Sequence, residues 1–158
     1  MIRDRLDAAP VVAAARRALG GREDAWVVGG AVRDAALGRE VRDLDVVVGG
    51  DPGAAARAIA AELRAPAFEL SGEFRTWRVA DRRGGRQIDV TALRGPSIEA
   101  DLAERDFTIG AVAVPLAGEG VIDPFDGVAD LERRRLRAVG ERSFIADPLR
   151  LLRAARLA

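Results

Sequence analysis

Residues 26–34 read Trp-Val-Val-Gly-Gly-Ala-Val-Arg-Asp, and residues 43–48 read Asp-Leu-Asp-Val-Val-Val. Three apolar residues, two glycines and a run of helix formers predict a strand, a tight turn and a short helix over residues 31–37 that ends at Gly38. After its acidic start, the second stretch is apolar and β-branched, as a central strand would be. These two stretches predict a unit of strand, helix and strand.

The rest of the chain adds helices and strands around this unit. Gly84-Gly85 predicts the turn of a hairpin. The expected helices cover residues 4–19, 53–64, 97–103 and 147 onward, with a helical turn over 130–135; the expected strands cover 67–70, 74–80 and 86–92, and residues 109–116 are part helix and part strand. Such a mixture predicts an α/β domain built on a small mixed sheet flanked by helices.

Composition excludes several kinds of chemistry. The 158 residues include no cysteine and no histidine, so disulfides, zinc sites, a histidine general base and a cysteine nucleophile are excluded. All 25 basic residues are arginine, balanced by 25 acidic residues. No apolar run is long enough to span a membrane, and the first residues do not open a signal peptide. We therefore expect a cytoplasmic protein.

Three aspartates are candidates for metal binding. Asp43 and Asp45 are two residues apart on a strand, so both side chains face the same side. Two such carboxylates repel each other unless a cation lies between them, and Mg²⁺ prefers oxygen ligands. Asp89 lies between apolar neighbours in another predicted strand; if the two strands are adjacent, it completes a three-carboxylate site. A solvated strand end remains the alternative for Asp43 and, less well, for Asp45; for Asp89 the alternative is an ordinary residue of an edge strand.

The glycine pair is a candidate phosphate site. Glycine lets backbone N–H groups approach an anion closely, and the following helix adds its dipole. Arg33 lies one turn into that helix, where it could contact a phosphate. An ordinary tight turn is the alternative interpretation.

These motifs, in this order and spacing, resemble those of one family. Gly29-Gly30 with Arg33-Asp34, followed by Leu37-Gly38 and Asp43-Leu-Asp45, is similar to the signature of class II tRNA nucleotidyltransferases (CCA-adding enzymes) and bacterial poly(A) polymerases. The likeness continues through residues 104–109 (Glu-Arg-Asp-Phe-Thr-Ile), residues 123–127 (Asp-Pro-Phe-Asp-Gly) and residues 147–156. It implies the DNA polymerase β-like nucleotidyltransferase fold.

The resemblance also implies roles for individual residues. Asp43, Asp45 and Asp89 would bind Mg²⁺ in a two-metal phosphoryl transfer. The nucleotide, CTP or ATP, would be held at its triphosphate by Gly29, Gly30 and Arg33. Arg105 and Asp106 would also contact it, Asp106 through the ribose. The closing helix would add Asp147, Arg150, Arg153 and Arg156.

Two side chains of the closing helix could select the base through their hydrogen-bond donors and acceptors. Asp147 and Arg150 are three residues apart and share a helix face. A carboxylate acceptor beside a guanidinium donor suits cytosine and adenine, which both present an amine beside a ring nitrogen, and rejects uracil and guanine. A simple salt bridge is the alternative. Arg153 and Arg156 continue the same side and could brace Asp147 or contact phosphate; a solvated stripe of arginines is the alternative.

The chain departs from the family pattern in sequence and in length. Glu104, Gly110 and Ala146 stand where arginine, asparagine and glutamate are usual, which affects nucleotide positioning. Residues 1–140 are expected to form the nucleotidyltransferase head and residues 141–158 the start of the neck, with body and tail domains absent. The chain is then either an excised head or a minimal enzyme. Exposed leucines at 149, 151 and 152 would favour self-association.

We therefore expect a template-independent RNA nucleotidyltransferase that adds C, A or both to an RNA 3′ end, with tRNA as the favoured acceptor. One alternative is addition of the poly(A) type. Another is a nucleotide-binding module with little activity alone.

Overall fold

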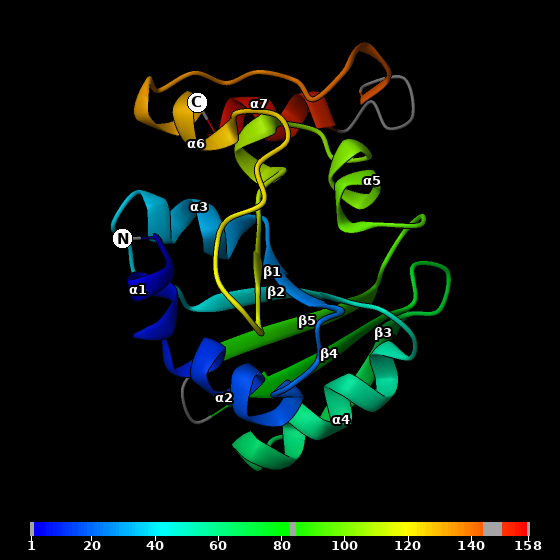
Figure 1. Cartoon of the computed structure of the whole chain (residues 1–158). Coiled ribbons are helices and arrows are strands. Elements are labelled where there is room, and N and C mark those ends of the chain that lie inside the picture. Colours follow the sequence, from blue (N-terminus) through cyan, green and yellow to red (C-terminus); the bar gives the residue numbers. More distant parts are fainter. Residues whose placement is uncertain (1, 83–84, 144–149, 158) are drawn as a thin grey trace.

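A six-stranded mixed sheet crosses the computed structural model, which describes residues 2–82, 85–143 and 150–157 (Figure 1). The strands are β1 (Ala25–Val28), β2 (Asp43–Val48), β3 (Ala67–Ser71), β4 (Thr76–Asp81), β5 (Arg86–Ala92) and β6 (Ala113–Pro115). Their order is β3-β4-β5-β2-β1-β6, with β2 and β5 parallel and the other neighbouring pairs antiparallel. The expectation of a mixed sheet flanked by helices is confirmed.

Helices cover both faces of this sheet. They are α1 (Ile2–Asp7), α2 (Pro10–Leu19), α3 (Gly30–Ala36), α4 (Pro52–Leu63), α5 (Ile98–Ala103), α6 (Gly127–Glu132) and α7 (Arg150–Leu157), with 3₁₀ turns η1 (Thr108–Gly110) and η2 (Glu141–Ser143). In Figure 1, α2 and α4 lie below the sheet, and α5, α6 and α7 lie above it.

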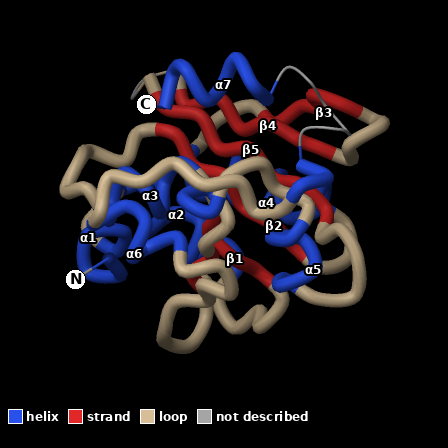
Figure 2. The backbone as a smooth tube through the Cα atoms, turned by 90° about the horizontal axis from the view of Figure 1, so that it is seen from above, coloured by secondary structure: helices blue, strands red, loops and turns tan. Residues whose placement is uncertain are grey.

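Alternation along β2 gives the sheet a closed face and an open face. Leu44, Val46 and Val48 are buried in the main core with α2 and α4. Val47 points the other way and packs with Ile98 and Leu102 of α5 in a smaller cluster. Asp43 and Asp45 share the side of Val47, so they lie on the open face. In the view from above, α5 and α7 lie on opposite sides of β2 and β5 (Figure 2).

Two strands match the predicted bounds residue for residue, β2 at 43–48 and β5 at 86–92. The β4–β5 hairpin is also confirmed, and Gly85 in its turn has φ of 61°. Residues 109–116 contain the end of η1 and all of β6, the predicted mixture.

Three predicted elements have the wrong limits. The single helix over 4–19 is two helices, because Pro10 cannot donate an N–H and disfavours helix in the residue before it; α2 therefore begins at Pro10. Strand 74–80 begins only at Thr76, since Arg75 has φ of 47° in the turn. The helical turn over 130–135 is α6, which ends at Glu132 before Arg134 adopts φ of 52°.

The segment Asp123–Gly127 explains the place of α6. The Asp123 carboxylate accepts hydrogen bonds from the backbone N–H of Gly127 (2.7 Å) and of Val128 (2.9 Å), so it satisfies the first free donors of the helix. A Cβ at Gly127 would overlap the carbonyl oxygen of Thr108 in η1 and lie 2.8 Å from Val112 Cγ2. Only glycine allows this approach of α6 to η1.

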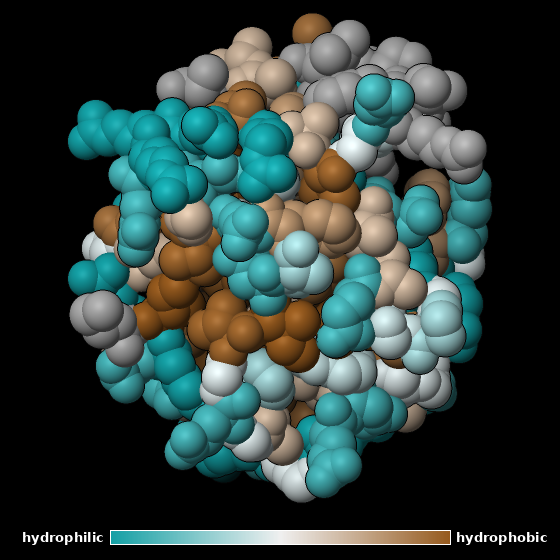
Figure 3. All heavy atoms as spheres, turned by 45° about the horizontal axis from the view of Figure 1, so that its top comes forward, coloured by the Kyte–Doolittle hydropathy of each residue, from teal (hydrophilic) through white to brown (hydrophobic). Residues whose placement is uncertain are grey.

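The surface of the described residues carries apolar as well as charged areas. None of the described helices has the length and hydropathy needed to cross a membrane. Figure 3 shows apolar atoms gathered in one area that hydrophilic residues border. Of the three leucines expected to favour self-association, Leu149 lies outside the described residues, as does the side chain of Leu151, and Leu152 is 70% exposed. Self-association stays a prediction.

Replacement of Gly127 by alanine tests the packing of α6 on η1. We expect Gly127→Ala to lower the free energy of unfolding by about 1 to 3 kcal/mol, because backbone must move to admit the methyl group. Urea unfolding followed by circular dichroism measures the change. Gly140→Ala is the matched control, since a Cβ there meets nothing within 4 Å. Equal stability of the two variants would contradict the close approach.

Candidate active site

The three predicted carboxylates lie on two neighbouring strands. Asp45 on β2 is the register partner of Asp89 on β5, and Asp43 lies two residues away on the same face as Asp45. Adjacent parallel strands therefore bring the three side chains to one area, as the sequence predicted.

Asp89 is already engaged by a cation. Arg78 on β4 is its register partner and donates from Nε to Oδ1 (2.7 Å) and from Nη2 to Oδ2 (2.8 Å). This hydrogen-bonded pairing raises the pKa of Arg78, as do the charges of Asp43 and Asp45. The sequence analysis did not name Arg78, because its pairing with Asp89 depends on the register of the hairpin, with Asp81 opposite Arg86, which the glycine pair alone does not fix.

Asp45 carries negative charge that the protein leaves largely uncompensated. Its carboxylate is exposed to the water of a cavity of about 270 Å³ that it lines with Arg94, Asp101 and Arg105, but protein surrounds it on the other sides. This burial raises the pKa of Asp45, and repulsion from Asp89 and then Asp43 adds to the increase; attraction by Arg105 opposes it.

The carboxylate oxygens of Asp43 and Asp45 fit a divalent cation that is held by two protein ligands. Across the described residues, no group of three or more histidine, cysteine or acidic side chains is arranged to hold a metal ion. Asp89 is bonded to Arg78 in this arrangement. Mg²⁺ is commonly bound by one or two carboxylates, with substrate phosphates and water as the other ligands, and Asp43 with Asp45 suits that pattern.

The glycine turn lies directly beside Asp45. Gly29 has φ of 67°, and a Cβ there would lie 3.2 Å from Arg105 Nη1 and 3.3 Å from Asp45 Oδ2. The absence of a side chain thus keeps the space between this carboxylate and this guanidinium open. At Gly30, a Cβ would lie 3.7 Å from Arg33 Nη2. Arg33 itself donates to Asp34 Oδ1 from Nε (3.0 Å) and Nη2 (2.9 Å).

Arg105 is held in place by a buried aspartate that the sequence analysis did not single out. Asp101 on α5 is fully buried. Its Oδ2 accepts from Arg105 Nη2 (3.1 Å), and its Oδ1 accepts from Arg94 Nε (3.1 Å) and Arg94 N (3.2 Å). The four-residue spacing of Asp101 and Arg105 was the available signal.

Asp106 is closed off rather than open to a ribose. The residue is 7% exposed, its Oδ1 accepts from the N–H of Phe107 (2.9 Å), and its Oδ2 lies 3.2 Å from Arg153 Nε. Arg153 stands on α7, which also packs Ala154 and Leu157 against Phe107 and Ile109. Arg153 therefore braces Asp106 in this structure.

The other predicted residues of the closing helix cannot be located. Asp147 lies outside the described residues, and Arg150 and Arg156 are described only in their backbone. The Asp147–Arg150 pair stays a prediction.

A second buried carboxylate joins η1 to α6 behind the site. Asp130 Oδ2 accepts from the Thr108 hydroxyl (2.7 Å) and from Arg137 Nε (2.9 Å). The hydrogen bond from Thr108 and the nearby Arg137 guanidinium lower the pKa of Asp130. A charged group in the interior is thus stabilised by hydrogen bonds and a cation.

The mixed sheet and the paired carboxylates beside a glycine turn are those of a DNA polymerase β-like nucleotidyltransferase. The family model described as the poly A polymerase head domain matches residues 25–97 and 73–137, which together exceed half of the chain. The chain belongs to this family.

Curated relatives agree with this assignment. A CC-adding tRNA nucleotidyltransferase of Geobacter sulfurreducens is 46% identical over 134 residues, which cover 85% of this chain and 31% of that protein. An A-adding tRNA nucleotidyltransferase of Deinococcus radiodurans is 46% identical over 132 residues, with coverage of 84% and 29%. The chain spans about a third of the length of these relatives.

Solved structures show the same fold. The Thermotoga maritima CCA-adding enzyme complexed with tRNA superposes with a TM-score of 0.82 at 31% identity, over 99% of this chain and 40% of that one. A CCA-adding enzyme complexed with CTP gives 0.83 at 30% identity, with coverage of 99% and 40%.

The lowered pKa of Asp130 predicts a pH-dependent stability. Asp130→Asn should lower the midpoint of thermal unfolding at pH 7, since the ion pair with Arg137 is lost. A carboxylate whose folded pKa lies below its unfolded value of about 3.9 stabilises the fold fully above that value, and the benefit is lost as pH falls through the folded pKa. The difference in unfolding midpoint between wild type and variant should therefore be constant from pH 5 to 8 and become smaller only below about pH 4.

Thermal melts across this pH range measure that gap. Asp126→Asn serves as control, because Asp126 is exposed and its side chain makes no capping hydrogen bond. A gap that opens or closes near neutral pH would contradict the assignment.

Proposed function

We propose that this chain is the catalytic head of a template-independent RNA nucleotidyltransferase that adds C, A or both, from CTP or ATP, to the 3′ end of tRNA. The observation that carries the proposal is the pair Asp43 and Asp45, on one face of β2, beside the open space that Gly29 leaves. Uncompensated carboxylates next to a glycine turn suit a metal-bound triphosphate.

The reaction joins two substrates. The 3′ hydroxyl oxygen of the RNA attacks the α-phosphorus of the nucleotide and forms the new O–P bond. The bond from the α-phosphorus to pyrophosphate breaks, pyrophosphate leaves, and the hydroxyl proton passes to water. A divalent cation, which we propose to be Mg²⁺, would neutralise charge on the phosphates and make the attacking hydroxyl more acidic. Asp43 and Asp45 would hold it. For Asp89 to act as a third ligand, its carboxylate would have to share its bonds with Arg78.

The basic residues around the carboxylates would orient the nucleotide. Gly29 and Gly30 would admit the triphosphate close to the backbone, and Arg33 would pair with its oxygens. Arg105 projects into the same space and is fixed by buried Asp101, so its charge is positioned before any ligand arrives. For Asp106 to contact the ribose, its carboxylate would have to exchange the ion pair with Arg153 for the ribose hydroxyls.

Base choice remains assigned to Asp147 and Arg150, by the complementarity of their acceptor and donor to C and A. Support for these bases comes from the names of relatives. They include CC-adding and A-adding enzymes at 46% identity and a multifunctional CCA protein of Xanthomonas campestris at 42%. Identity alone does not choose among them.

The acceptor and the domain division are proposals of the same kind. A solved relative at 31% identity is complexed with tRNA, which supports tRNA as the acceptor, and a cytoplasmic location would follow from it. We propose residues 1–140 as the head and 141–158 as the start of a neck. Addition of the poly(A) type is the nearest alternative.

A second candidate, a nucleotide-binding module with little activity alone, is favoured by two internal ion pairs. Arg78 engages Asp89, and Arg153 engages Asp106, so two of the proposed site residues are occupied by the chain itself. A ligand would have to compete with both.

Nucleotide incorporation tests the first proposal. Each of the four labelled triphosphates is offered, with Mg²⁺, to tRNA that lacks its 3′ CCA. We expect incorporation of C, A or both, and a loss of about 100-fold or more in Asp43→Ala and Asp45→Ala, because phosphate charge is no longer neutralised. Chelation of the metal should stop the wild-type reaction, and added Mg²⁺ should restore it.

Glu40→Ala is the matched control, since Glu40 is an exposed carboxylate near the same strand, bonded only to Arg42 among the described residues. Circular dichroism checks that all variants fold. Undiminished incorporation in either aspartate variant would contradict metal binding by Asp43 and Asp45. Saturable binding of CTP or ATP without incorporation would favour the second candidate.

A further inference from the structure

One arginine of the sheet is bonded directly to a candidate metal ligand. Arg78 on β4 and Asp89 on β5 are register partners, so their side chains leave the same face of the sheet. Hydrogen bonds from Nε to Oδ1 (2.7 Å) and from Nη2 to Oδ2 (2.8 Å) join them as a fork. The two side chains are only 30% and 23% exposed, so water screens this pair less than it screens a surface ion pair. Both oxygens of Asp89 are therefore engaged by one cation.

The strand register keeps this positive charge at Asp89. Directly opposed residues of an antiparallel pair have Cβ atoms about 4.5 to 5.5 Å apart, so an arginine at position 78 is within reach of the carboxylate. The next pair along the strands, Val79 opposite Ile88, is buried in the main core, and a slip of register would expose it. A guanidinium also keeps its charge throughout the physiological pH range. Arg78 is thus a cation that cannot dissociate from the site.

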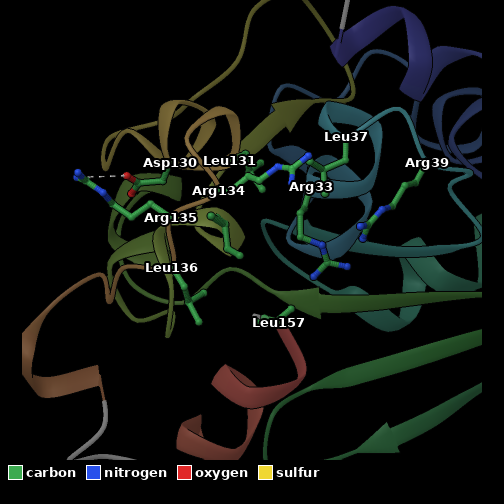
Figure 4. Close-up of a pocket in the computed structure, with 10 residues that line it drawn as sticks. Arg33, Leu37, Arg39, Asp130, Leu131, Arg134, Arg135, Leu136 and Leu157 are labelled. Atoms are coloured by element: carbon green, nitrogen blue, oxygen red, sulfur yellow. Dashed lines mark ion pairs between the residues drawn. The ribbon is translucent and has the colours of Figure 1, made fainter.

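The other arginines near the acidic residues have different partners or positions. Arg105 bonds to the buried carboxylate of Asp101. Figure 4 shows Arg33 and Arg39 pointing toward one another in a pocket of about 790 Å³, and Asp43, Asp45 and Asp89 are not among the described residues that line it.

In the described part of the chain, Arg78 is therefore the guanidinium that is hydrogen-bonded to a candidate metal ligand. The charge that remains on the acidic residues matches one divalent ion. Asp43, Asp45 and Asp89 carry one negative charge each, and Arg78 balances one of the three. A single divalent cation held by Asp43 and Asp45 would balance the other two.

A second ion would lie about 3.5 to 4 Å from the first and would draw on the oxygens of Asp89. It would have to break both charge-assisted hydrogen bonds of the fork and lie beside a fixed positive charge. The pairing with Arg78 therefore opposes the binding of a second metal ion.

We propose that Arg78 is the second cation of this site: the chain binds one divalent ion, at Asp43 and Asp45, and the guanidinium takes the place of a second ion at Asp89. The inference rests on the proposed function for its assignment of Asp43 and Asp45 as metal ligands. It departs from the two-metal transfer that the family resemblance implies. Arg78 is then a positioning residue, which acts through Asp89.

Binding of Mn²⁺ to the full 158-residue chain, without nucleotide or RNA, tests the inference. Mn²⁺ accepts the same oxygen ligands as Mg²⁺, and electron paramagnetic resonance of the free ion gives the number bound per chain. We expect about one ion in the wild type and about two in Arg78→Gln, because Asp89 is released from the guanidinium. Arg78→Lys keeps a positive charge opposite Asp89, so it should bind the same number as the wild type.

Two further variants locate the additional ion. Arg78→Gln combined with Asp89→Asn should return to the wild-type number, because the carboxylate that holds the additional ion is gone. Arg75→Gln is the matched control, since Arg75 is an exposed arginine in the turn before β4 that donates to the carbonyl oxygen of Gly50 (3.3 Å). It removes the same charge and should leave the number of bound ions unchanged.

Circular dichroism checks that each variant folds. A second ion in the wild type, no additional ion in Arg78→Gln, an additional ion in Arg75→Gln as well, or no bound ion in any of these chains would overturn the inference.

Metal binding and turnover fail independently, because the ion count needs neither nucleotide nor acceptor. An additional ion in Arg78→Gln supports the inference even if the wild type incorporates no nucleotide, and in that case the proposed function fails alone. If incorporation occurs and depends on Asp43 and Asp45 while Arg78→Gln binds no additional ion, the proposed function stands and the inference about Arg78 fails.

Discussion

Repulsion between carboxylates on neighbouring strands is the constraint around which this domain is built. Asp43 and Asp45 face the same side of β2, and the parallel pairing with β5 adds Asp89 to that side. Placing like charges this close together is costly unless cations are near. One guanidinium, Arg78 on β4, is bonded to Asp89, whereas Arg105, which follows α5, and Arg153 on α7 attract Asp45 only through space.

Buried aspartates in turn fix other arginines. Asp101 is fully buried and holds Arg94 and Arg105; Asp130 is fully buried and holds Arg137. Each buried aspartate also joins two elements through hydrogen bonds. Asp101 connects α5 to the segment after β5, and Asp130 connects α6 to η1 through Thr108. Removing one partner of such a pair would leave a buried charge without compensation, which is more damaging than losing an exposed pair.

Much of this arrangement could be predicted from the sequence, because local patterns determine it. Strand β2 follows from its β-branched run, and β5 follows from its place after Gly84-Gly85. The split at Pro10 was also a local signal, but the apolar spacing of residues 4–19 masked it. The start of α6 was missed because it depends on Asp123 capping and on the contact of Gly127 with η1, which is tertiary.

The site was predicted less completely than the fold. Carboxylates beside a glycine turn have a sequence signature, so Asp43, Asp45 and Gly29 could be named in advance. The engagement of Asp89 by Arg78 requires strand register, and that of Asp106 by Arg153 requires the docking of α7. The spacing of residues around Asp89 or Asp106 encodes neither of these two contacts. Pairing between distant segments therefore decides which members of a recognised motif are open.

The exclusive use of arginine has a consequence for proton exchange. The chain has no lysine, histidine, cysteine or tyrosine. Its titratable side chains are therefore carboxylates, with reference pKa values near 4, and guanidinium groups, with reference pKa values above 12. Burial raises the pKa of the Asp45 carboxyl above its usual range. Over the physiological range the protein thus presents an almost constant charge to its surroundings.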